Sequence, residues 1–576
     1  MTQFLAGILP ELLNSPYVWA ALLSPLVTVF VYVVLPHFTT RLGLRKYPGP
    51  ALAGFTRLWL AKQVRVGKRS AIVHEEHEKY GTPSASFFSP PPPPPLPNKP
   101  ADLPVLSFSP FLYIGTGKFV RIGPKEVSIN DPAALPVVYA HGNGSLKTDF
   151  YDAFVASKNR GLFNTRDRGE HTRKRKIVSH TFAPKSVREF EPYINSTVRI
   201  LFKKWDALSE KAKKNPDIDT ARYGKHMRGY SVVETLDWYN ALAFDIIGDL
   251  AFGAPFDMLE RDGADIVAIT KEDGTVIHAP AVQILNERGE YSATLGCLPP
   301  WIRPYMKTID PWFARGLASV NNLTGIARTR VNARLEHGAG DRKDILSHLQ
   351  NGKDAEGKPM GVPELTAEAL TQLIAGSDTT SNSSCAIMYY IVANPAAHKK
   401  LQQELDSTFG PRGVEGVLDY DDVKALPYLQ ACIQEALRLH ATSGMGLPRL
   451  MTQDTEVCGE VFPAGTILSV PSYSIHRLKS YWGQDADEFR PERWLVSEDR
   501  VKEMEKALNI FSYGPRSCVG RNVATMELYC FISSLILRYD FKLVDQSGKN
   551  LEVVEGFLRK PTGCLMGLKR REVETI

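Results

Sequence analysis

The stretch FSYGPRSCVG at residues 511–520 places one cysteine, Cys518, in a glycine-punctuated turn before a helical pattern over residues 521–537. A thiolate at the N-terminus of a helix is favoured by the exposed backbone N–H groups and by the helix dipole. Phe511 can cover the sulfur, and Arg516 can meet an anionic group beside it. A thiolate with an apolar cover and a nearby cation suits the axial ligand of a haem iron. A lone cysteine without these neighbours is usually an apolar filler.

A second unusual stretch, AGSDTT at residues 375–380, lies in the middle of a long apolar helix predicted over Leu365–Val392. Glycine and consecutive threonines lower helix propensity, and hydroxyl groups can bond back to the preceding turn and bend the helix. We expect a groove beside Gly376 with room for a small ligand on a flat cofactor. Asp378 and Thr379 would then form an acid–alcohol pair able to relay protons through water. The alternative is a helix-packing motif of small residues.

Composition and charge are those of an ordinary globular protein, because 43% of the 576 residues are hydrophobic and 23% are charged. The net charge of +6 is modest for this length and is not gathered in a tail of the kind that binds nucleic acid. The seven cysteines are scattered without a C-x-x-C pair. This pattern argues against a disulfide framework or a zinc site and for a reducing compartment.

The N-terminal region contains an uncharged apolar run, Tyr17–Leu35, long enough to cross a bilayer core of about 30 Å as a helix. No lysine or arginine precedes it and three follow closely, so the positive-inside tendency places residues 1–16 in the lumen and the body in the cytosol. We predict an uncleaved anchor over residues 17–36, followed by a stiff Pro/Gly linker over residues 37–50. A cleaved signal peptide is the alternative, but its positive first region is missing.

Residues 82–117 interrupt the chain with six consecutive prolines and further prolines nearby, which favours polyproline II and is unsuited to a helix or sheet interior. A helix end is predicted before them, at residues 74–81, and a β-hairpin after them, at residues 118–129. If the segment were removed, the helix would connect directly to the hairpin. We interpret residues 82–117 as a retained intron or a gene-model error; a proline-rich docking site is the alternative.

Beyond Asp149 we predict a mostly helical chain with few strands. Residues 255–300 mix glycine, charged and apolar residues without a clear period, and we predict a loop-rich region there. The expected fold is mainly α with a small β region, in one catalytic domain over residues 51–576 behind the anchor. Helical patterns cover residues 171–183, Thr235–Ala251 and Leu317–Leu335.

The cysteine turn and the AGSDTT stretch together resemble the cytochrome P-450 monooxygenases. The haem-binding pattern F-x-x-G-x-R-x-C-x-G of that family is matched at every fixed position around Cys518. Its oxygen-activation segment, [A/G]-G-x-[D/E]-T-[T/S], is matched at residues 375–380. The resemblance implies the P-450 fold, haem b with Cys518 as the iron ligand, and proton management by Asp378 and Thr379.

The same resemblance gives a role to two opposite charges, Glu435 and Arg438, which stand three residues apart on a predicted helix. Such pairs are usually exposed and contribute little to stability. The family uses the pair as a buried lock, joined by an arginine from a later Pro-Glu-Arg segment. That segment is present at residues 491–493, so Arg493 is expected as the third partner in a structural rather than a chemical role.

Haem propionates require cations or other donors, and the resemblance supplies four: Arg516, Arg449, His171 and Arg175. It also places Phe511 and Gly376 beside the cofactor. Many family members have tryptophan where this chain has His171, a change that keeps a donor. Lys174 and Lys176 are expected on the cysteine side, where an acidic reductase could dock. A solvated helix face is the alternative for these basic residues.

Further blocks, several at places where the family builds its substrate pocket, resemble the fungal benzoate 4-monooxygenases: residues 141–147, 149–154, 160–167, 243–256 and 442–449. This resemblance implies hydroxylation of benzoate to 4-hydroxybenzoate with O2 and with NADPH electrons from a cytochrome P-450 reductase. It also implies a single-pass protein of the endoplasmic reticulum membrane. The alternatives are another aromatic or lipophilic substrate, a haem-thiolate isomerase or dehydratase, and a haem sensor without turnover. The intact Asp378–Thr379 pair speaks against an isomerase.

Overall fold

The computed structural model describes residues 42–81, 117–156, 159–338, 340–354, 356–410, 415–547 and 551–572, together with Ser24 and Val27. The predicted anchor and the proline-rich segment lie outside the described residues, apart from Ser24, Val27 and Gly117. Within the described ranges, none of the helices combines the length and the apolar character needed to span a bilayer.

Helices make up most of the described chain, as the sequence predicts. The longer ones are α4 (Leu58–Arg65), α5 (Arg69–Gly81), α7 (Arg168–Thr181), α9 (Glu191–Lys214), α11 (Thr235–Phe252), α12 (Ala281–Cys297), α14 (Pro311–His337), α16 (Val362–Ala393), α17 (Pro395–Phe409), α19 (Pro427–His440), α22 (Glu498–Ala507) and α23 (Arg521–Arg538). Short α-helices are α6 (Ala134–Tyr139), α8 (Pro184–Arg188), α10 (Thr220–Tyr223), α13 (Met306–Ile309), α15 (Ile345–Asn351), α18 (Tyr420–Val423), α20 (Ser472–Ile475) and α21 (Lys479–Trp482). The 3-10 turns are η2 (Leu44–Lys46), η3 (Ala51–Gly54), η4 (Asp149–Phe154), η5 (Lys225–Met227), η6 (Arg303–Tyr305), η8 (Pro491–Trp494) and η9 (Gly514–Arg516).

The described strands form several small sheets. The five-stranded sheet has the order β1-β2-β10-β7-β3 and contains β1 (Phe119–Gly123), β2 (Glu126–Ile129), β3 (Leu146–Lys147), β7 (Arg449–Leu450) and β10 (Ile467–Ser469). β1 and β2 are the predicted hairpin, with Val120 opposite Ser128. The three-stranded sheet has the order β11 (Tyr539–Leu543), β14 (Leu565–Arg570), β4 (Ser231–Glu234). Two-stranded sheets pair β5 (Ile266–Thr270) with β6 (Val276–Pro280), β8 (Thr455–Val457) with β9 (Glu460–Phe462), and β12 (Val553–Glu555) with β13 (Arg559–Pro561).

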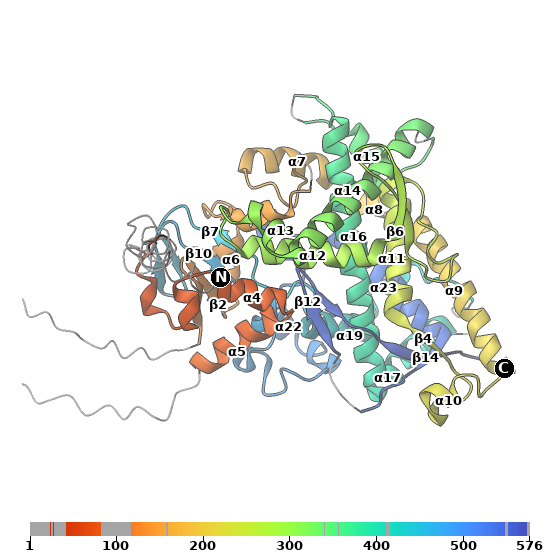
Figure 1. Cartoon of the computed structure of the whole chain (residues 1–576). Helices are drawn as coiled ribbons and strands as arrows, with labels where there is room; N and C mark the ends of the chain where they lie inside the picture. The colour runs from red at the N-terminus through yellow and green to blue at the C-terminus, as the bar shows by residue number, and fades with distance from the viewer. Residues whose placement is uncertain are drawn as a thin grey trace, which may run out of the picture.

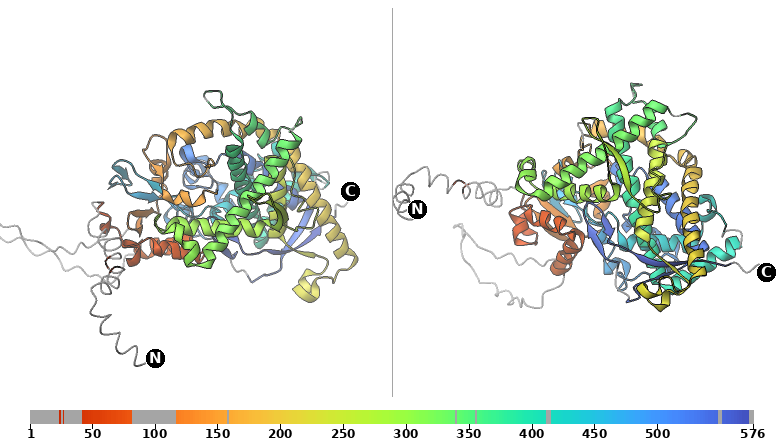
Figure 2. Two further views of the ribbon diagram at one scale, coloured as in Figure 1. Left: turned by 45° about the horizontal axis from the view of Figure 1, so that its top comes forward. Right: turned by 45° about the vertical axis from the view of Figure 1, so that its right-hand side comes forward.

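Helix α16 is the central element of the helical body (Figure 1). It packs against α11, α14, α19 and α23, and its apolar side chains belong to the main hydrophobic core. The five-stranded sheet lies on the other side of the molecule, near α4 and α5, which stay at the edge in both views of Figure 2. A side chain on α16 can therefore meet loops that come from the sheet side, and the site described below uses this arrangement.

The loop-rich region predicted for residues 255–300 is wrong. β5 and β6 pair there as an antiparallel hairpin with Ile269 opposite Ile277, and α12 follows directly. α12 packs against α4, η4 and α14. Its apolar pattern escaped notice because Arg288 and Gly289, which are unusual residues for a buried helix, stand in its middle.

Glu435, Arg438 and Arg493 meet in the interior, as predicted. The Glu435 carboxylate has no exposed surface and accepts hydrogen bonds from Arg438 Nε at 2.9 Å, Arg438 Nη2 at 2.8 Å and Arg493 Nε at 3.2 Å. Trp494 Nε1 donates to the same carboxylate at 3.0 Å. Arg438 Nη1 also donates to the carbonyl oxygen of His476 at 2.6 Å. The lock therefore fastens α19 to η8 and to the loops that precede the cysteine turn.

The two described ends that flank residues 82–116 meet each other. His77 Nδ1 lies 2.6 Å from the carbonyl oxygen of Gly117, and a Cβ added at Gly117 would lie 2.5 Å from the Cα atom of Gly81. On the other side of the junction, Lys118 Nζ contacts the Asp131 carboxylate at 2.8 Å. The end of α5 and the start of β1 are therefore neighbours, close enough for a direct connection between them.

Loss of the Glu435 anion should destabilise the protein. In Glu435→Gln, two buried guanidinium groups would lose their carboxylate, and we expect the free energy of unfolding to fall by roughly 3–5 kcal/mol in urea or thermal unfolding. The control is Glu498→Gln, because that exposed carboxylate has only a 3.4 Å contact with Lys502 and should matter by less than about 0.5 kcal/mol. A Glu435→Gln protein as stable as the control would contradict the structural role.

Deletion of Thr82–Gly117, with Gly81 joined to Lys118, should preserve or raise the yield of folded, haem-loaded protein. The physical reason is that Gly81 already lies beside Gly117 and can take its place before β1. Haem content per chain measures the outcome, and peptide mapping of protein from the source organism shows whether native peptides read straight through the junction. Recovery of peptides from the proline run, together with loss of activity on deletion, would overturn the intron hypothesis.

Candidate active site

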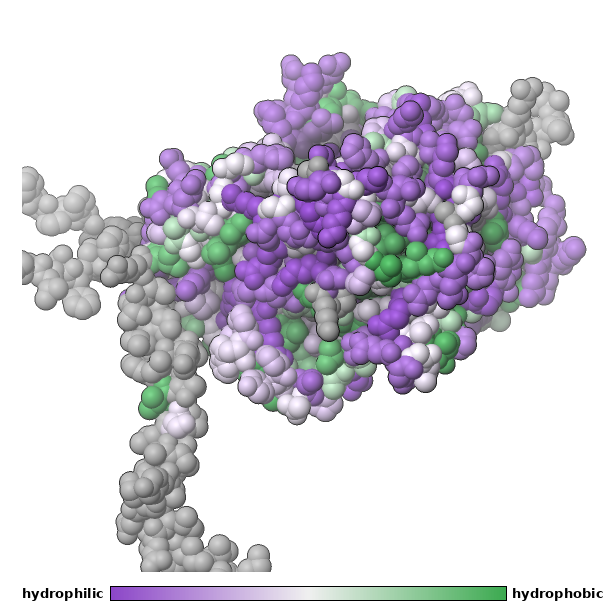
Figure 3. Space-filling view, turned by 90° about the horizontal axis from the view of Figure 1, so that it is seen from above, coloured by the Kyte–Doolittle hydropathy of each residue, from purple (hydrophilic) through white to green (hydrophobic). Residues whose placement is uncertain are grey.

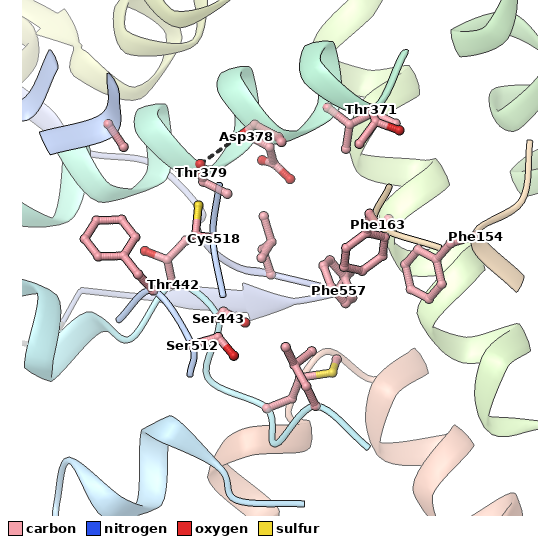
Figure 4. Close-up of a pocket in the computed structure, with 18 of the residues that line it drawn as sticks. Phe154, Phe163, Thr371, Asp378, Thr379, Thr442, Ser443, Ser512, Cys518 and Phe557 are labelled. Atoms are coloured by element: carbon pink, nitrogen blue, oxygen red, sulfur yellow. Dashed lines mark hydrogen bonds between the residues drawn. The ribbon is translucent and has the colours of Figure 1, made fainter. Parts of the chain in front are cut away.

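A cavity of about 290 Å³ lies between α16 and the turn that carries Cys518 (Figure 4). Cys518 lines it on one side, while Asp378 and Thr379 line it from α16. Residues from the segments expected to form pocket walls also line it, including Phe154, Phe163, Asn164, Thr442, Ser443 and Met445. The cavity therefore brings together the two stretches that the sequence singled out for chemistry.

The turn around Cys518 is closed by its own backbone. Cys518 N donates to the carbonyl oxygen of Phe511 at 2.8 Å, and α23 begins three residues later. Gly514 has φ +70°, and a Cβ there would lie 2.0 Å from the carbonyl oxygen of Tyr139, so this position excludes a side chain. The Cys518 side chain lines the cavity together with Phe511.

The pKa of the Cys518 thiol lies above its usual value. Desolvation raises it and outweighs the Gly520 N–H and the positive charges of Arg175 and Arg521, which lower it. The argument from the helix N-terminus alone therefore overstates how far the protein favours the thiolate. A metal ion deprotonates a thiol that coordinates it, so a bound iron would provide the positive charge that the turn lacks.

Asp378 and Thr379 lie on the cavity face of α16 (Figure 4). Thr379 Oγ1 donates to the carbonyl oxygen of Ala375 at 2.7 Å, so the hydroxyl oxygen remains able to accept a hydrogen bond. Asp378 Oδ1 accepts a hydrogen bond from Asn382 Nδ2 at 2.9 Å. Burial raises the pKa of the Asp378 carboxyl, and the charge of Lys560 opposes this shift. The pair can thus hold a proton and accept a water molecule next to each other.

The groove predicted beside Gly376 is wrong. α16 is one continuous helix, and a Cβ at Gly376 would lie 2.6 Å from Cδ1 of Ile247 on α11. Gly376 does not line the cavity, whereas Ala375 and Thr379 do. The glycine permits close packing of α11 on α16, which is the helix-packing alternative considered from the sequence.

Five basic side chains gather around the cysteine side of the cavity: Lys147, His171, Arg175, Arg449 and Arg516. Among the described residues none of them forms an ion pair; Arg175 donates to Ser517 O at 2.7 Å and Arg516 to Thr165 O at 2.6 Å. Burial and the charges of its neighbours lower the pKa of His171 to about 3, so its ring is neutral. Arg449 Nη1 donates to Tyr151 Oη at 2.7 Å, but its Nη2 is buried and has no hydrogen-bond partner in the described part of the chain.

Like charges in a buried site repel one another, and an uncompensated buried cation is strongly unfavourable. An anion that the described residues do not provide would therefore stabilise this cluster. The two carboxylates of a haem would supply that charge, and Cys518 would offer a sulfur ligand for its iron. The residues present fit a haem, and the predicted set of Arg516, Arg449, His171 and Arg175 would hold its propionates.

Lys147 and Arg288 are two basic residues of this region that sequence analysis missed. Lys147 is buried, which lowers the pKa of its amine well below the usual value, and its Nζ donates to the carbonyl oxygen of Phe163. A lysine in a short edge strand carries no signal of such a position. Arg288 lines the cavity from α12 and did carry a signal, because it stands within an apolar helical stripe. The stripe consists of Ala281, Ile284, Leu285, Tyr291 and Leu295.

The expectation that Lys174 faces a reductase is wrong. Its side chain is 3% exposed and contacts Glu368 at 3.5 Å and Glu364, both on α16. The two carboxylates follow the helix N-terminus of α16 at positions where the sequence shows no basic partner, so only the fold reveals the pairing. Lys176 is exposed, which fits both a reductase-facing position and a solvated helix face.

Replacing Arg516 with leucine should weaken haem retention, because a propionate would lose a cation that lines the cavity. We expect haem transfer to apomyoglobin to become faster by on the order of 10- to 100-fold, the range for a hydrogen bond to a charged group. Arg168→Leu is the control, since Arg168 is exposed and its Nη2 donates to Ser145 O at 3.2 Å. Equal transfer rates for the two variants would contradict the assignment of the cluster.

Comparison with known proteins agrees with this site. A family model described as Cytochrome P450 matches residues 118–567. The chain is 45% identical to benzoate 4-monooxygenase bphA of Aspergillus niger, over 97% of this chain and 99% of that protein. It is 29% identical to the cytochrome P450 monooxygenase gsfF of Penicillium aethiopicum, over 93% of this chain and 96% of that protein. The chain therefore belongs to the cytochrome P450 family and is a haem-thiolate monooxygenase.

Proposed function

We propose that this protein hydroxylates benzoate to 4-hydroxybenzoate, using O2 and NADPH electrons delivered by a cytochrome P450 reductase. The observation that carries the proposal is the 45% identity, over almost the whole of both chains, to a protein named benzoate 4-monooxygenase. The cavity is consistent with this substrate, because it is small and aromatic side chains line part of it. Small-molecule sites are typically apolar concavities with a few polar groups.

Haem b, when bound through Cys518, supplies the activation of O2 and the transfer of one oxygen atom to the substrate. Cys518 Sγ would be its iron ligand, and Arg516, Arg449, His171 and Arg175 would hold its propionates. Phe511 lines the cavity beside the turn and would cover the sulfur on that side. The unpaired Nη2 of Arg449 supports this assignment, because a buried donor without a partner is unfavourable.

Asp378 and Thr379 would manage the protons that the reaction consumes. The Asp378 carboxyl has a raised pKa and is steadied by Asn382, so it can hold a proton and release it into the cavity. Thr379 Oγ1 donates a hydrogen bond to Ala375 O and can accept a hydrogen bond from a water molecule, which would order that water beside Asp378. The reducing partner would meet the cysteine side, where Lys176 and Arg521 are exposed.

We place the protein at the endoplasmic reticulum membrane, with residues 17–36 as a single-pass anchor and the catalytic body in the cytosol. The hydrophobic run in the sequence supports this placement. A surface apolar group supports it too, made of Leu52, Leu58, Val66, Trp301, Tyr305 and Ile309, all more than half exposed. Arg65 Nη1 and the Asp310 carboxylate, 2.6 Å apart, bring the α4 and α13 parts of this group together. By contrast, the face shown in Figure 3 is mostly hydrophilic.

Benzoate should change the spin state of the haem iron in the wild type. With reductase and NADPH the protein should then form 4-hydroxybenzoate as its main product, identified by chromatography and mass spectrometry. Cys518→His should form none, and its ferrous carbonyl spectrum should lose the red-shifted thiolate band. A folded, thiolate-ligated wild type that neither binds benzoate nor hydroxylates it at the para position would overturn the proposal.

Thr379→Ala should leave benzoate binding nearly unchanged and divert reducing equivalents to hydrogen peroxide, because the water beside Asp378 would lose its hydrogen-bond partner. The ratio of 4-hydroxybenzoate and of peroxide to NADPH consumed measures this. Thr366→Ala is the matched control: its hydroxyl makes the same bond to the preceding turn of the same helix, to Val362 O at 2.8 Å, but it does not line the cavity. Unchanged coupling in Thr379→Ala would remove the proposed role of the acid–alcohol pair.

A further inference from the structure

Arg288 is a buried cation for which the described part of the chain provides no anionic partner. Its side chain comes from the middle of α12, lines the cavity and is only 6% exposed. Among the described residues it forms no ion pair and no side-chain hydrogen bond; its recorded contact is with the ring of Phe154, 5.2 Å from the guanidinium carbon to the centroid. Other buried arginines, such as Arg334 and Arg438, are paired with carboxylates at about 3 Å.

Arg288 stays protonated in its buried position, and burying this charge without an anionic partner is energetically unfavourable. Burial lowers its pKa only to about 10, with Asp378 opposing the shift, so the guanidinium is a cation at neutral pH. Asp378 acts on it through the cavity but lies beyond ion-pair distance and is already bonded to Asn382. A desolvated, unpaired guanidinium is strongly unfavourable, and an anion entering the cavity would remove that penalty.

Aromatic side chains surround the space beside this cation. Phe557 stands 4.8 Å from Phe154 and 5.3 Å from Phe163, measured between ring centroids, and all three rings line the cavity. In Figure 4, Phe154 and Phe163 lie at the end of the view away from Cys518. The cavity therefore has an apolar, aromatic end that carries one positive charge and an opposite end that carries the thiol.

We propose that Arg288 binds the carboxylate of the substrate. This inference rests on the proposed function and names the residue that fixes its substrate class and orientation. The planar guanidinium presents two parallel N–H donors to the two carboxylate oxygens, a geometry for which arginine is better suited than lysine. The aromatic ring then packs among Phe154, Phe163 and Phe557. Because the acid group is held at the end away from Cys518, the para carbon is the ring position that points back toward it.

Other basic side chains near the cavity lack one or more of the features that Arg288 combines. Lys560 Nζ donates to Asn286 Oδ1 at 2.8 Å and does not line the cavity. Arg516 lines it, but belongs to the cluster on the cysteine side and donates to the carbonyl oxygen of Thr165. Arg288 is the cation that combines burial, access to the cavity and an aromatic setting.

The test compares acids with their uncharged amides in haem-loaded protein. Dissociation constants are measured by calorimetry and by the haem spectrum for benzoate and benzamide, and for 2-naphthoate and 2-naphthamide. Arg288→Gln should weaken binding of the preferred acid by on the order of 100-fold and leave its amide nearly unchanged. Arg288→Lys should retain part of the preference, because it keeps the charge but loses the planar pair of donors. Arg330→Gln is the matched control, since Arg330 also lies over a phenylalanine ring, Phe256 at 4.2 Å, but away from the cavity.

Selective loss of acid binding in Arg288→Gln, with Arg330→Gln unaffected, supports the proposal. An unchanged acid-over-amide preference in Arg288→Gln would overturn it even if the wild type hydroxylates benzoate. If the wild type prefers 2-naphthoate and Arg288→Gln removes that preference, the role of Arg288 holds and the assignment of benzoate fails. A wild type that binds no acid more tightly than its amide overturns the role of Arg288 whether or not the variants fold.

Discussion

The removal of charged side chains from water governs both the fold and the site of this protein. At Glu435 the problem is solved within the chain, because two arginines and an indole N–H surround a carboxylate with no exposed surface. Around the cavity, the described residues leave two charged groups incompletely paired. Arg449 keeps an unpaired donor on the cysteine side, and Arg288 has no anionic partner at the aromatic end. A carboxylate-bearing cofactor and a carboxylate-bearing substrate are the groups that complete these two places.

Binding and stability should therefore be linked in this protein. A ligand that pairs with a buried cation in the folded state binds the unfolded chain poorly, so it raises the free energy of unfolding as its concentration exceeds its dissociation constant. The lock at Glu435 needs no ligand and can hold α19 and the loops before the cysteine turn in place beforehand. The buried charges at Glu435 are thus paired within the chain, whereas the buried cations around the cavity would be paired only when the cofactor and the substrate bind.

Much of this could be predicted from the sequence. Strongly periodic segments such as Leu365–Val392 became helices nearly as predicted, and the cysteine turn, Asp378 and Thr379 meet at one cavity because their motifs are local. The failures involve partners distant in the chain. Lys174 is buried because α16 supplies carboxylates to it, and the space beside Gly376 is filled by α11. α12 was not predicted because Arg288 interrupts its apolar stripe and so weakens the helical periodicity, although the same residue gives the helix its proposed role.

The contact between Gly81 and Gly117 has a use beyond the question of how the intervening residues arose. A position where two internal residues such as Gly81 and Gly117 lie side by side is suited to the insertion of a folded domain. An inserted domain whose own termini lie close together can be added there without moving either residue. This insertion site lies on the side of α5 and the five-stranded sheet (Figure 1), so an inserted domain would be attached to that side of the molecule rather than to the helical body. A flavin-containing electron donor or a fluorescent reporter could be carried at this site as an internal fusion, which leaves both termini of the chain unchanged.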